Sequence, residues 1–347
     1  MEYRVLGGTG IRVSTHCLGT MMFGSWGNTD VDECVRVVHS ALDAGINFVD
    51  TADVYSAGGS EEIVGKAIAG RRDEIVLATK FHNPMGEGRN ERGNSRLWIM
   101  RAVEASLRRL GTDHIDLYQL HRPEAETDID ETLSALTDLQ RAGTIRAFGS
   151  STFHGWQVVE AQWAAERRGL ERFRTEQPPY SILTRHIEHD VLPAALSYRM
   201  GVLVWSPLAR GWLTGRYQRG SFDRSPESRA TRAKGGPIAA LFDEERPETQ
   251  AKLDAVERLA GIADEAGIPM AHMAVAFTLA HPAVTSAIVG PRKPEQIEDL
   301  LAGADVRLDD ATLDAIDAVV PPGTTIDQVD RGFSPWWLEP SRRRRSP

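Results

Sequence analysis

Short apolar runs alternate with longer amphipathic stretches along most of the chain, and each apolar run of strand length is followed by a stretch with helical spacing of apolar residues. The predicted strands are residues 16–19, 47–50, 75–80, 115–120, 145–150, 174–177, 202–206 and 286–289. The predicted helices are residues 32–44, 60–69, 95–110, 130–142, 155–167, 189–198, 247–266 and 294–301. Strands that alternate with helices pair in parallel through right-handed crossovers. Eight such repeats predict an α/β fold that closes into a (β/α)8 TIM barrel.

An open, doubly wound sheet is the main alternative, but it usually has fewer strands or a clear division into halves, and the pattern shows neither. One more helix is expected over 309–319. We expect a single barrel domain over residues 1–332 and an irregular C-terminal tail over 333–347. Residues 216–246 are polar and too numerous for an ordinary barrel loop, so they form either a lid over the active site or a disordered segment.

The glycines near the N-terminus resemble a dinucleotide-binding loop. Gly7, Gly8 and Gly10 have the required density, but that motif leads directly into a helix. Residues 11–14 alternate between apolar and polar side chains instead. The pattern therefore favours a β-hairpin over residues 3–14 with a glycine-rich turn, and a phosphate loop is the alternative.

Composition narrows the class of function. The 347 residues carry a net charge of −9, whereas nucleic-acid binders and proteins that bind anionic membranes tend to be basic, so a small-molecule substrate is favoured. The basic run 342–345 is interpreted as a solvated tail, with a docking or localisation signal as the alternative. Two cysteines, no recognisable signal peptide and no apolar run of membrane-spanning length predict a cytoplasmic protein with no membrane segment.

Four reactive side chains follow successive predicted strands. Asp50, Lys80 and His121 stand at strand ends, and Tyr55 lies five residues after Asp50. The carboxyl ends of TIM-barrel strands form the catalytic face, so these side chains are expected to meet. Lys80 is expected to lower the pKa of Tyr55, Asp50 to pair with Lys80, and His121 to orient a substrate oxygen. Each residue alone is more often structural, but together they predict a site that protonates an oxygen gaining negative charge.

Residues 47–55, 78–80 and 116–121 resemble the signature of the aldo-keto reductase family, and the similarity extends over about nine-tenths of the chain. The resemblance implies NADPH/NADP+ as cofactor, reduction of an aldehyde or ketone to an alcohol or the reverse oxidation, and Asp50, Tyr55, Lys80 and His121 as catalytic residues. The chain is also similar to potassium channel β subunits, which implies a redox-sensing regulatory subunit as the alternative. A third possibility is a barrel that forms a Schiff base through Lys80.

The same resemblance implies a set of cofactor-binding positions. They are Gly19, Thr20, Ser151, Thr152, Gln177, Trp205, Ser206, Pro207, Leu208, Arg210, Gly211, Gly290, Arg292, Lys293 and Gln296. Thr152 and Leu300 stand where the family often has Asn. Arg292 and Lys293 precede a predicted helix, where two cations favour the 2′-phosphate of NADPH over NADH.

Substrate-pocket residues are expected on loops that follow the strands. The candidates are Met22, Phe23, Trp26, His82 and Trp98. His186 and His189 lie beside Asp190, but no further ligand cluster is evident, so no metal site is predicted. A homo-oligomer is possible, because barrels of this kind occur alone and in assemblies.

Overall fold

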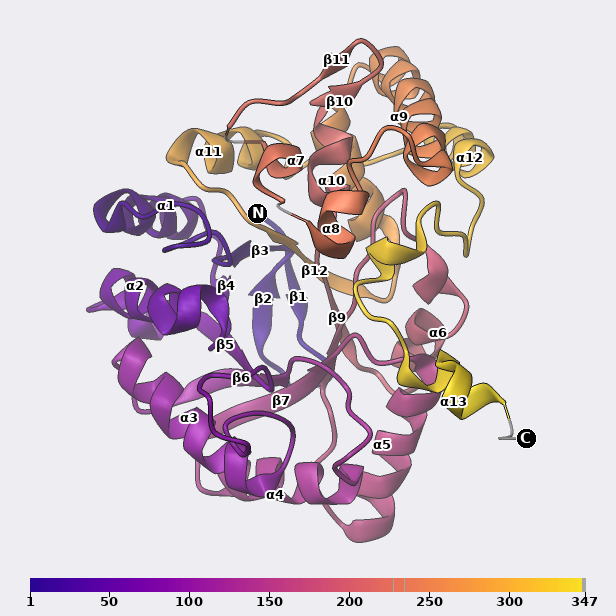
Figure 1. Cartoon of the computed structure of the whole chain (residues 1–347). Helices are drawn as coiled ribbons and strands as arrows, with labels where there is room; N and C mark the ends of the chain where they lie inside the picture. Colours follow the sequence, from indigo (N-terminus) through magenta and orange to yellow (C-terminus); the bar gives the residue numbers. More distant parts are fainter. Residues whose placement is uncertain (227, 234, 345–347) are drawn as a thin grey trace. The chain divides into compact units, whose positions relative to one another are not determined.

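The structure is a computed structural model that describes residues 1–226, 228–233 and 235–344 (Figure 1). The chain divides into two compact units. The barrel unit comprises Met1–Pro178, Asp190–Trp205 and His281–Asp305, and the second unit comprises Pro179–His189, Ser206–Ala280 and Val306–Pro347. The single domain expected over residues 1–332 stays a prediction.

Eight parallel strands of the barrel unit close into a barrel in the order β12-β3-β4-β5-β6-β7-β8-β9. The strands are β3 (His16–Gly19), β4 (Phe48–Asp50), β5 (Val76–Phe81), β6 (Ile115–Leu120), β7 (Ile145–Ser151), β8 (Thr175–Gln177), β9 (Gly201–Val204) and β12 (Val284–Val289). The predicted TIM barrel is therefore confirmed. Strand β9 ends before Trp205, so the strand predicted to reach residue 206 is shorter than expected.

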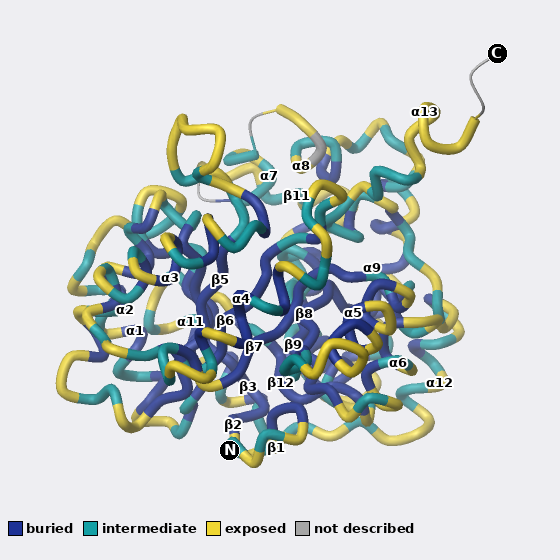
Figure 2. Tube along the Cα trace, turned by 90° about the horizontal axis from the view of Figure 1, so that it is seen from below, coloured by how far each residue is buried: buried dark blue, intermediate teal, exposed yellow. Residues whose placement is uncertain are grey.

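Helices cover the outside of this barrel (Figure 1). They are α1 (Val31–Asp43), α2 (Gly59–Ile68), α3 (Arg96–Leu110), α4 (Ile129–Arg141), α5 (Gly155–Arg168), α6 (Val191–Ser197) and α11 (Pro294–Ala302). The side chains of Asp30 and Ser95 accept backbone N–H bonds at the starts of α1 and α3. Gly111 ends α3 in the left-handed conformation that glycine adopts without steric cost. Figure 2 shows the barrel strands buried and the helices alternating between buried and exposed positions.

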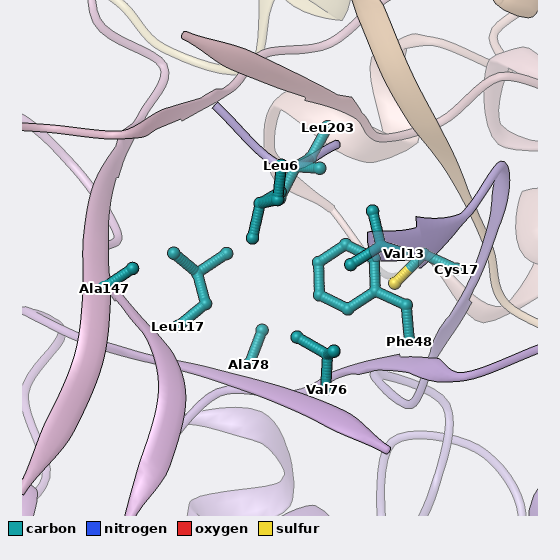
Figure 3. Close-up of a cluster of buried hydrophobic side chains, with 9 residues drawn as sticks. All are labelled: Leu6, Val13, Cys17, Phe48, Val76, Ala78, Leu117, Ala147 and Leu203. Carbon is teal, nitrogen blue, oxygen red and sulfur yellow. The ribbon is translucent and has the colours of Figure 1, made fainter. Parts of the chain in front are cut away.

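The predicted N-terminal hairpin is present and contributes to the apolar core of the barrel. Strands β1 (Tyr3–Val5) and β2 (Arg12–Ser14) pair antiparallel. Leu6 and Val13 pack with buried residues of the barrel strands, among them Phe48 and Val76 at the starts of β4 and β5 (Figure 3). Gly7 is required in the turn, because its φ is +50° and a Cβ would lie 1.8 Å from the Arg174 carbonyl oxygen. The hairpin thus packs at the amino ends of the strands and leaves the carboxyl ends for chemistry.

The second unit contains longer helices and several short elements. The helices are α7 (Arg229–Arg232), α8 (Gly236–Ala240), α9 (Pro247–Ala266), α10 (Met270–Ala280), α12 (Asp310–Val319) and α13 (Pro340–Arg343). Helix α10 was not predicted, because it is buried on all sides from His272 to Thr278 and so has no amphipathic period. The extra helix near the C-terminus is present as α12.

The long polar segment contains secondary structure in the residues that are described. It holds a two-stranded ribbon, β10 (Tyr217–Gln218) and β11 (Ser221–Phe222), followed by α7 and α8. Residues 227 and 234 of this segment lie outside the described residues. The tail is not wholly irregular, because Trp336–Leu338 and α13 are helical, and its residues 345–347 also lie outside the description. Within the described part of the chain, no helix has the length and apolar character to cross a membrane.

Candidate active site

An ion pair between Asp50 and Lys80 lies at the carboxyl ends of β4 and β5. The Lys80 Nζ donates to Asp50 Oδ1 at 2.5 Å and to the carbonyl oxygen of Thr51 at 2.8 Å. The amides of Gln177 and Gln119 donate to the second oxygen of Asp50, at 2.9 and 3.3 Å. Burial acts to lower the pKa of Lys80, but the charges of Asp50 and Tyr55 outweigh it and raise that pKa. Lys80 is therefore a buried ammonium held in one position by its partners.

Tyr55 begins a short 3-10 helix, Tyr55–Gly58, just after β4. The Lys80 Nζ lies 5.2 Å from the centre of the Tyr55 ring. The ring also meets the Trp26 ring at a centroid distance of 5.8 Å and the edge of the His121 ring at 5.8 Å. Burial raises the pKa of Tyr55 by more than Lys80 lowers it, so the expected effect of Lys80 is present but the net shift is upward. Tyr55 is a neutral phenol at physiological pH, able to donate its proton.

His121 follows β6 and meets a residue that the sequence did not single out. Its Nδ1 lies 3.0 Å from the side-chain nitrogen Nδ2 of Asn83. Burial, followed by the charges of Arg122 and Lys80, holds the pKa of His121 well below its usual value. The imidazole is therefore neutral at physiological pH and carries one ring N–H.

The loop after β7 is supported by two ionisable side chains, Arg122 and Glu176, that sequence reasoning missed. Thr152 has a φ of +60°, which is unusual for a β-branched residue. Its hydroxyl accepts a hydrogen bond of 2.7 Å from the guanidinium of Arg122, which also donates to the His121 carbonyl oxygen. The buried carboxyl of Glu176 accepts from the Phe153 N–H at 3.0 Å and from the Ser150 hydroxyl at 2.5 Å. Burial raises the pKa of Glu176 to about 8.

The other predicted cofactor residues near the strand ends are closely packed. The Thr20 hydroxyl donates to the Asp50 carbonyl oxygen at 3.1 Å, and the Ser151 hydroxyl donates to the Gln177 carbonyl oxygen at 2.8 Å. A Cβ at Gly19 would lie 2.6 Å from a methyl carbon of Ile288, so a larger residue would require the Ile288 side chain to move. The Gln177 side chain, expected to grip a nicotinamide, already contacts Asp50.

Helix α11 begins beside the two predicted phosphate-binding cations. Lys293 occupies the N-cap position without a side-chain capping bond, and the helix starts at Pro294. The side-chain oxygen of Gln296 accepts a 2.7 Å bond from the Arg292 N–H, while Asn28 donates to the Arg292 carbonyl oxygen at 2.8 Å. Gly290 precedes this turn. An uncapped helix start with adjoining cations fits an anionic group.

The loop predicted to bind a pyrophosphate, from Ser206 to Leu213, belongs to the second unit. Ser206, Ala209 and Arg210 all have positive φ values, at 57°, 46° and 59°. Such turns can direct main-chain N–H groups towards an anion. The Arg210 guanidinium lies 3.4 Å from the Asp330 carboxylate and its side chain is only 11% exposed. The Arg210 side chain is thus paired with Asp330. The main-chain N–H groups of the loop are therefore better placed to donate hydrogen bonds to an anion.

The predicted substrate residues divide into two groups. Phe23 and Trp98 are buried, and Trp98 lies in α3 rather than on a loop, so their part in a substrate pocket stays a prediction. Trp26 is 44% exposed and contacts the Tyr55 ring. Met22 and His82 are half-buried. Among the residues that the structure describes, no group of three or more His, Cys, Asp or Glu side chains is placed to hold a metal ion.

The parallel barrel, with a buried lysine–carboxylate pair beside a tyrosine, was compared with known proteins to find the family to which the chain belongs. Residues 17–321 match the model of the Aldo/keto reductase family. The chain is 40% identical over 335 residues to "Uncharacterized oxidoreductase YrpG" of Bacillus subtilis (strain 168), covering 93% of this chain and 97% of that protein. It is 36% identical over 330 residues to "Probable voltage-gated potassium channel subunit beta" of Arabidopsis thaliana, covering 92% and 97%. It is 33% identical over 332 residues to "Versiconal hemiacetal acetate reductase" of Aspergillus parasiticus, covering 89% and 94%. The chain belongs to the aldo/keto reductase family.

Proposed function

We propose that this protein catalyses the NADPH-dependent reduction of an aldehyde or ketone, or the reverse oxidation, with Tyr55 as the general acid. The observation that carries the proposal is the buried Asp50–Lys80 ion pair at the barrel's carboxyl end, with its ammonium 5.2 Å from the Tyr55 ring. This arrangement suits proton donation to a carbonyl oxygen, because the phenol keeps its proton until the oxygen gains charge and the ammonium then stabilises the phenolate.

The remaining polar groups act on Lys80 and on the substrate. Asp50, held by the amides of Gln119 and Gln177, fixes the ammonium in place. The neutral His121 ring donates its N–H to the carbonyl oxygen and orients it towards Tyr55. NADPH, when bound, supplies the hydride that reduces the carbonyl carbon.

We assign the cofactor's contacts to separate parts of the chain. Ser151, Thr152 and Gln177 would hold the carboxamide beside Trp205, and Arg292 with Lys293 would hold the 2′-phosphate. In the second unit, the backbone of the loop from Ser206 to Gly211 would bind the pyrophosphate. The uncapped start of α11 and the positive φ values of that loop support these assignments.

A regulatory subunit is the second candidate, because one of the relatives is named as a potassium channel β subunit. Such a protein would bind NADPH tightly and turn over every carbonyl negligibly. A Schiff-base enzyme is disfavoured, because its Lys80 must be a neutral amine, whereas the Asp50 pair raises the pKa of Lys80. We further propose a cytoplasmic location and a small-molecule substrate.

The test is a titration of the whole chain with NADPH and with NADH, followed by tryptophan fluorescence. Cofactor binding is expected to quench the fluorescence of Trp205. The variant Trp205→Phe shows how much of the fluorescence change comes from this one of the eight tryptophans. Lys293→Gln should weaken NADPH and leave NADH unchanged, while the exposed control Arg101→Gln should change neither. Binding of neither nucleotide would overturn the proposal. Binding without turnover on a panel of aldehydes and ketones would favour the regulatory subunit.

A further inference from the structure

The backbone after β5 makes an unusual turn beside the catalytic face. His82 has a φ of +132°, a strained conformation for a non-glycine residue that persists only when neighbours impose it. Here the His82 carbonyl oxygen accepts from the Gly93 N–H at 2.7 Å, and its Nδ1 lies 2.8 Å from Asn94 Oδ1. The Phe81 carbonyl oxygen accepts from the His121 N–H at 3.0 Å. These bonds fix the turn relative to the end of β6.

The turn brings Asn83 onto the ring of His121. Its side-chain nitrogen Nδ2 lies 3.0 Å from His121 Nδ1. An amide NH2 group can only donate, so Nδ1 must accept and carry no proton. The opposite orientation of the amide would place its oxygen there and require a proton on Nδ1.

The surroundings of His121 decide how many protons the ring holds. The ring is buried, the charges of Arg122 and Lys80 oppose a further positive charge, and His82 lies nearby. A neutral ring carries one proton, and since Nδ1 accepts from Asn83, that proton is on Nε2.

We propose that Asn83 is a positioning residue that holds His121 in the Nε2–H tautomer, so that the ring can donate to the substrate's carbonyl oxygen. The inference rests on the proposed function, in which His121 orients that oxygen. In the other tautomer Nε2 would present a lone pair to the carbonyl oxygen and repel it. The strained turn at His82 thus holds the side-chain amide of Asn83 against Nδ1 of His121.

The tautomer can be read without any turnover. The full chain is prepared with ¹⁵N-labelled histidine, and the His121 resonances are assigned among the ten histidines by comparison with His121→Gln. We expect the wild-type ring to show a protonated Nε2 and a bare Nδ1. Asn83→Ala should give a mixture of tautomers, and Asn83→Asp should move the proton to Nδ1, because a carboxylate only accepts. The exposed Asn90 on the same loop provides the matched control, and Asn90→Ala should match the wild type.

Activity gives the second readout. Asn83→Ala should lower kcat about tenfold, the effect of one lost hydrogen bond, with unchanged NADPH affinity and no further loss in a His121→Ala background. A wild-type ring protonated on Nδ1, or a tautomer unaffected by Asn83→Ala, would overturn the inference even if the protein is a reductase. Conversely, the predicted tautomers in a protein without carbonyl turnover would contradict the proposed function and leave the role of Asn83 in setting the tautomer intact.

Discussion

Replacing Asp50 with Asn tests whether the ion pair holds Lys80 in place. The substitution keeps the shape of the side chain and removes its charge. Lys80 is fully buried and loses the carboxylate of Asp50, while its bond of 2.8 Å to the Thr51 carbonyl oxygen remains. Removing one member of a buried pair typically costs about 3–5 kcal/mol, because an uncompensated charge stays in the interior. We expect Asp50→Asn to lower the free energy of unfolding by about that amount at pH 7.

The ion pair also predicts how the stabilities of the wild type and Asp50→Asn change with pH. In the wild type the pKa of Lys80 is raised, so its stabilisation is fully present below the unfolded value of about 10.4 and disappears as the pH rises through the folded value. In Asp50→Asn the Thr51 carbonyl oxygen and the neighbouring phenol remain, but without the carboxylate, burial lowers the pKa of Lys80. The folded variant then binds fewer protons than the unfolded chain, and its stability rises with pH towards about 10.4. The difference between the two proteins should therefore narrow as the pH rises from 7 to 10.

Urea unfolding at pH 7 and at pH 10 measures both effects. Asp50→Asn combined with Lys80→Met should recover part of the lost stability at pH 7, because the double variant buries no unpaired charge. Equal stability of wild type and Asp50→Asn at pH 7, or a difference that stays constant with pH, would refute this account of the pair.

Further substitutions test other parts of the structure. Because burial raises the pKa of Glu176 to about 8, this carboxyl lowers the free energy of unfolding by about 1.4 kcal/mol per pH unit as the pH rises from about 5 to 8. Glu176→Gln should reduce this dependence of stability on pH, as measured by urea unfolding at several pH values. Asp330→Asn should destabilise the second unit by less than the about 3–5 kcal/mol of a lone buried pair, because Asp327 stays 3.5 Å from the fully buried Lys252; chemical unfolding that shows no loss would argue against the 2.5 Å pair of Lys252 with Asp330. Gly7→Ala should lower the Tm far more than Gly10→Ala, since both have positive φ but only the first would place a Cβ against a carbonyl oxygen; equal shifts in a thermal scan would contradict this.

The barrel and the four candidate catalytic residues were accessible from sequence because they depend on local patterns. Strand ends in a parallel barrel share one face whatever the details of packing, so Asp50, Lys80 and His121 could be brought together from their places after apolar runs. The N-terminal hairpin followed from period-two alternation after the glycines. Helix α10 could not be found in this way, because a helix buried on every side has no polar face to reveal its period.

Properties that depend on burial could not be predicted. The direction of the Tyr55 pKa shift is set by a balance between desolvation and the Lys80 charge, and the sequence indicates only the charge. Phe23 and Trp98 were expected on loops that follow the strands, but both are buried and Trp98 lies in α3. Asn83 belongs to no recognisable sequence motif. Its contact with His121 depends on the positive φ of His82, and a histidine in the sequence does not indicate such a conformation. The nearest available signal was the presence of polar residues directly after β5.

The most direct test of the central claim is the turnover of Tyr55→Phe, measured with its NADPH affinity. The substitution removes one hydroxyl and keeps the ring, whose contacts with Trp26 and His121 do not require the oxygen. If Tyr55 is the general acid, kcat for carbonyl reduction should fall by about 10²–10⁴ while tryptophan fluorescence reports unchanged NADPH binding. A Tyr55→Phe variant that reduces carbonyls at the wild-type rate would contradict the account, because the proton would then have to come from another group.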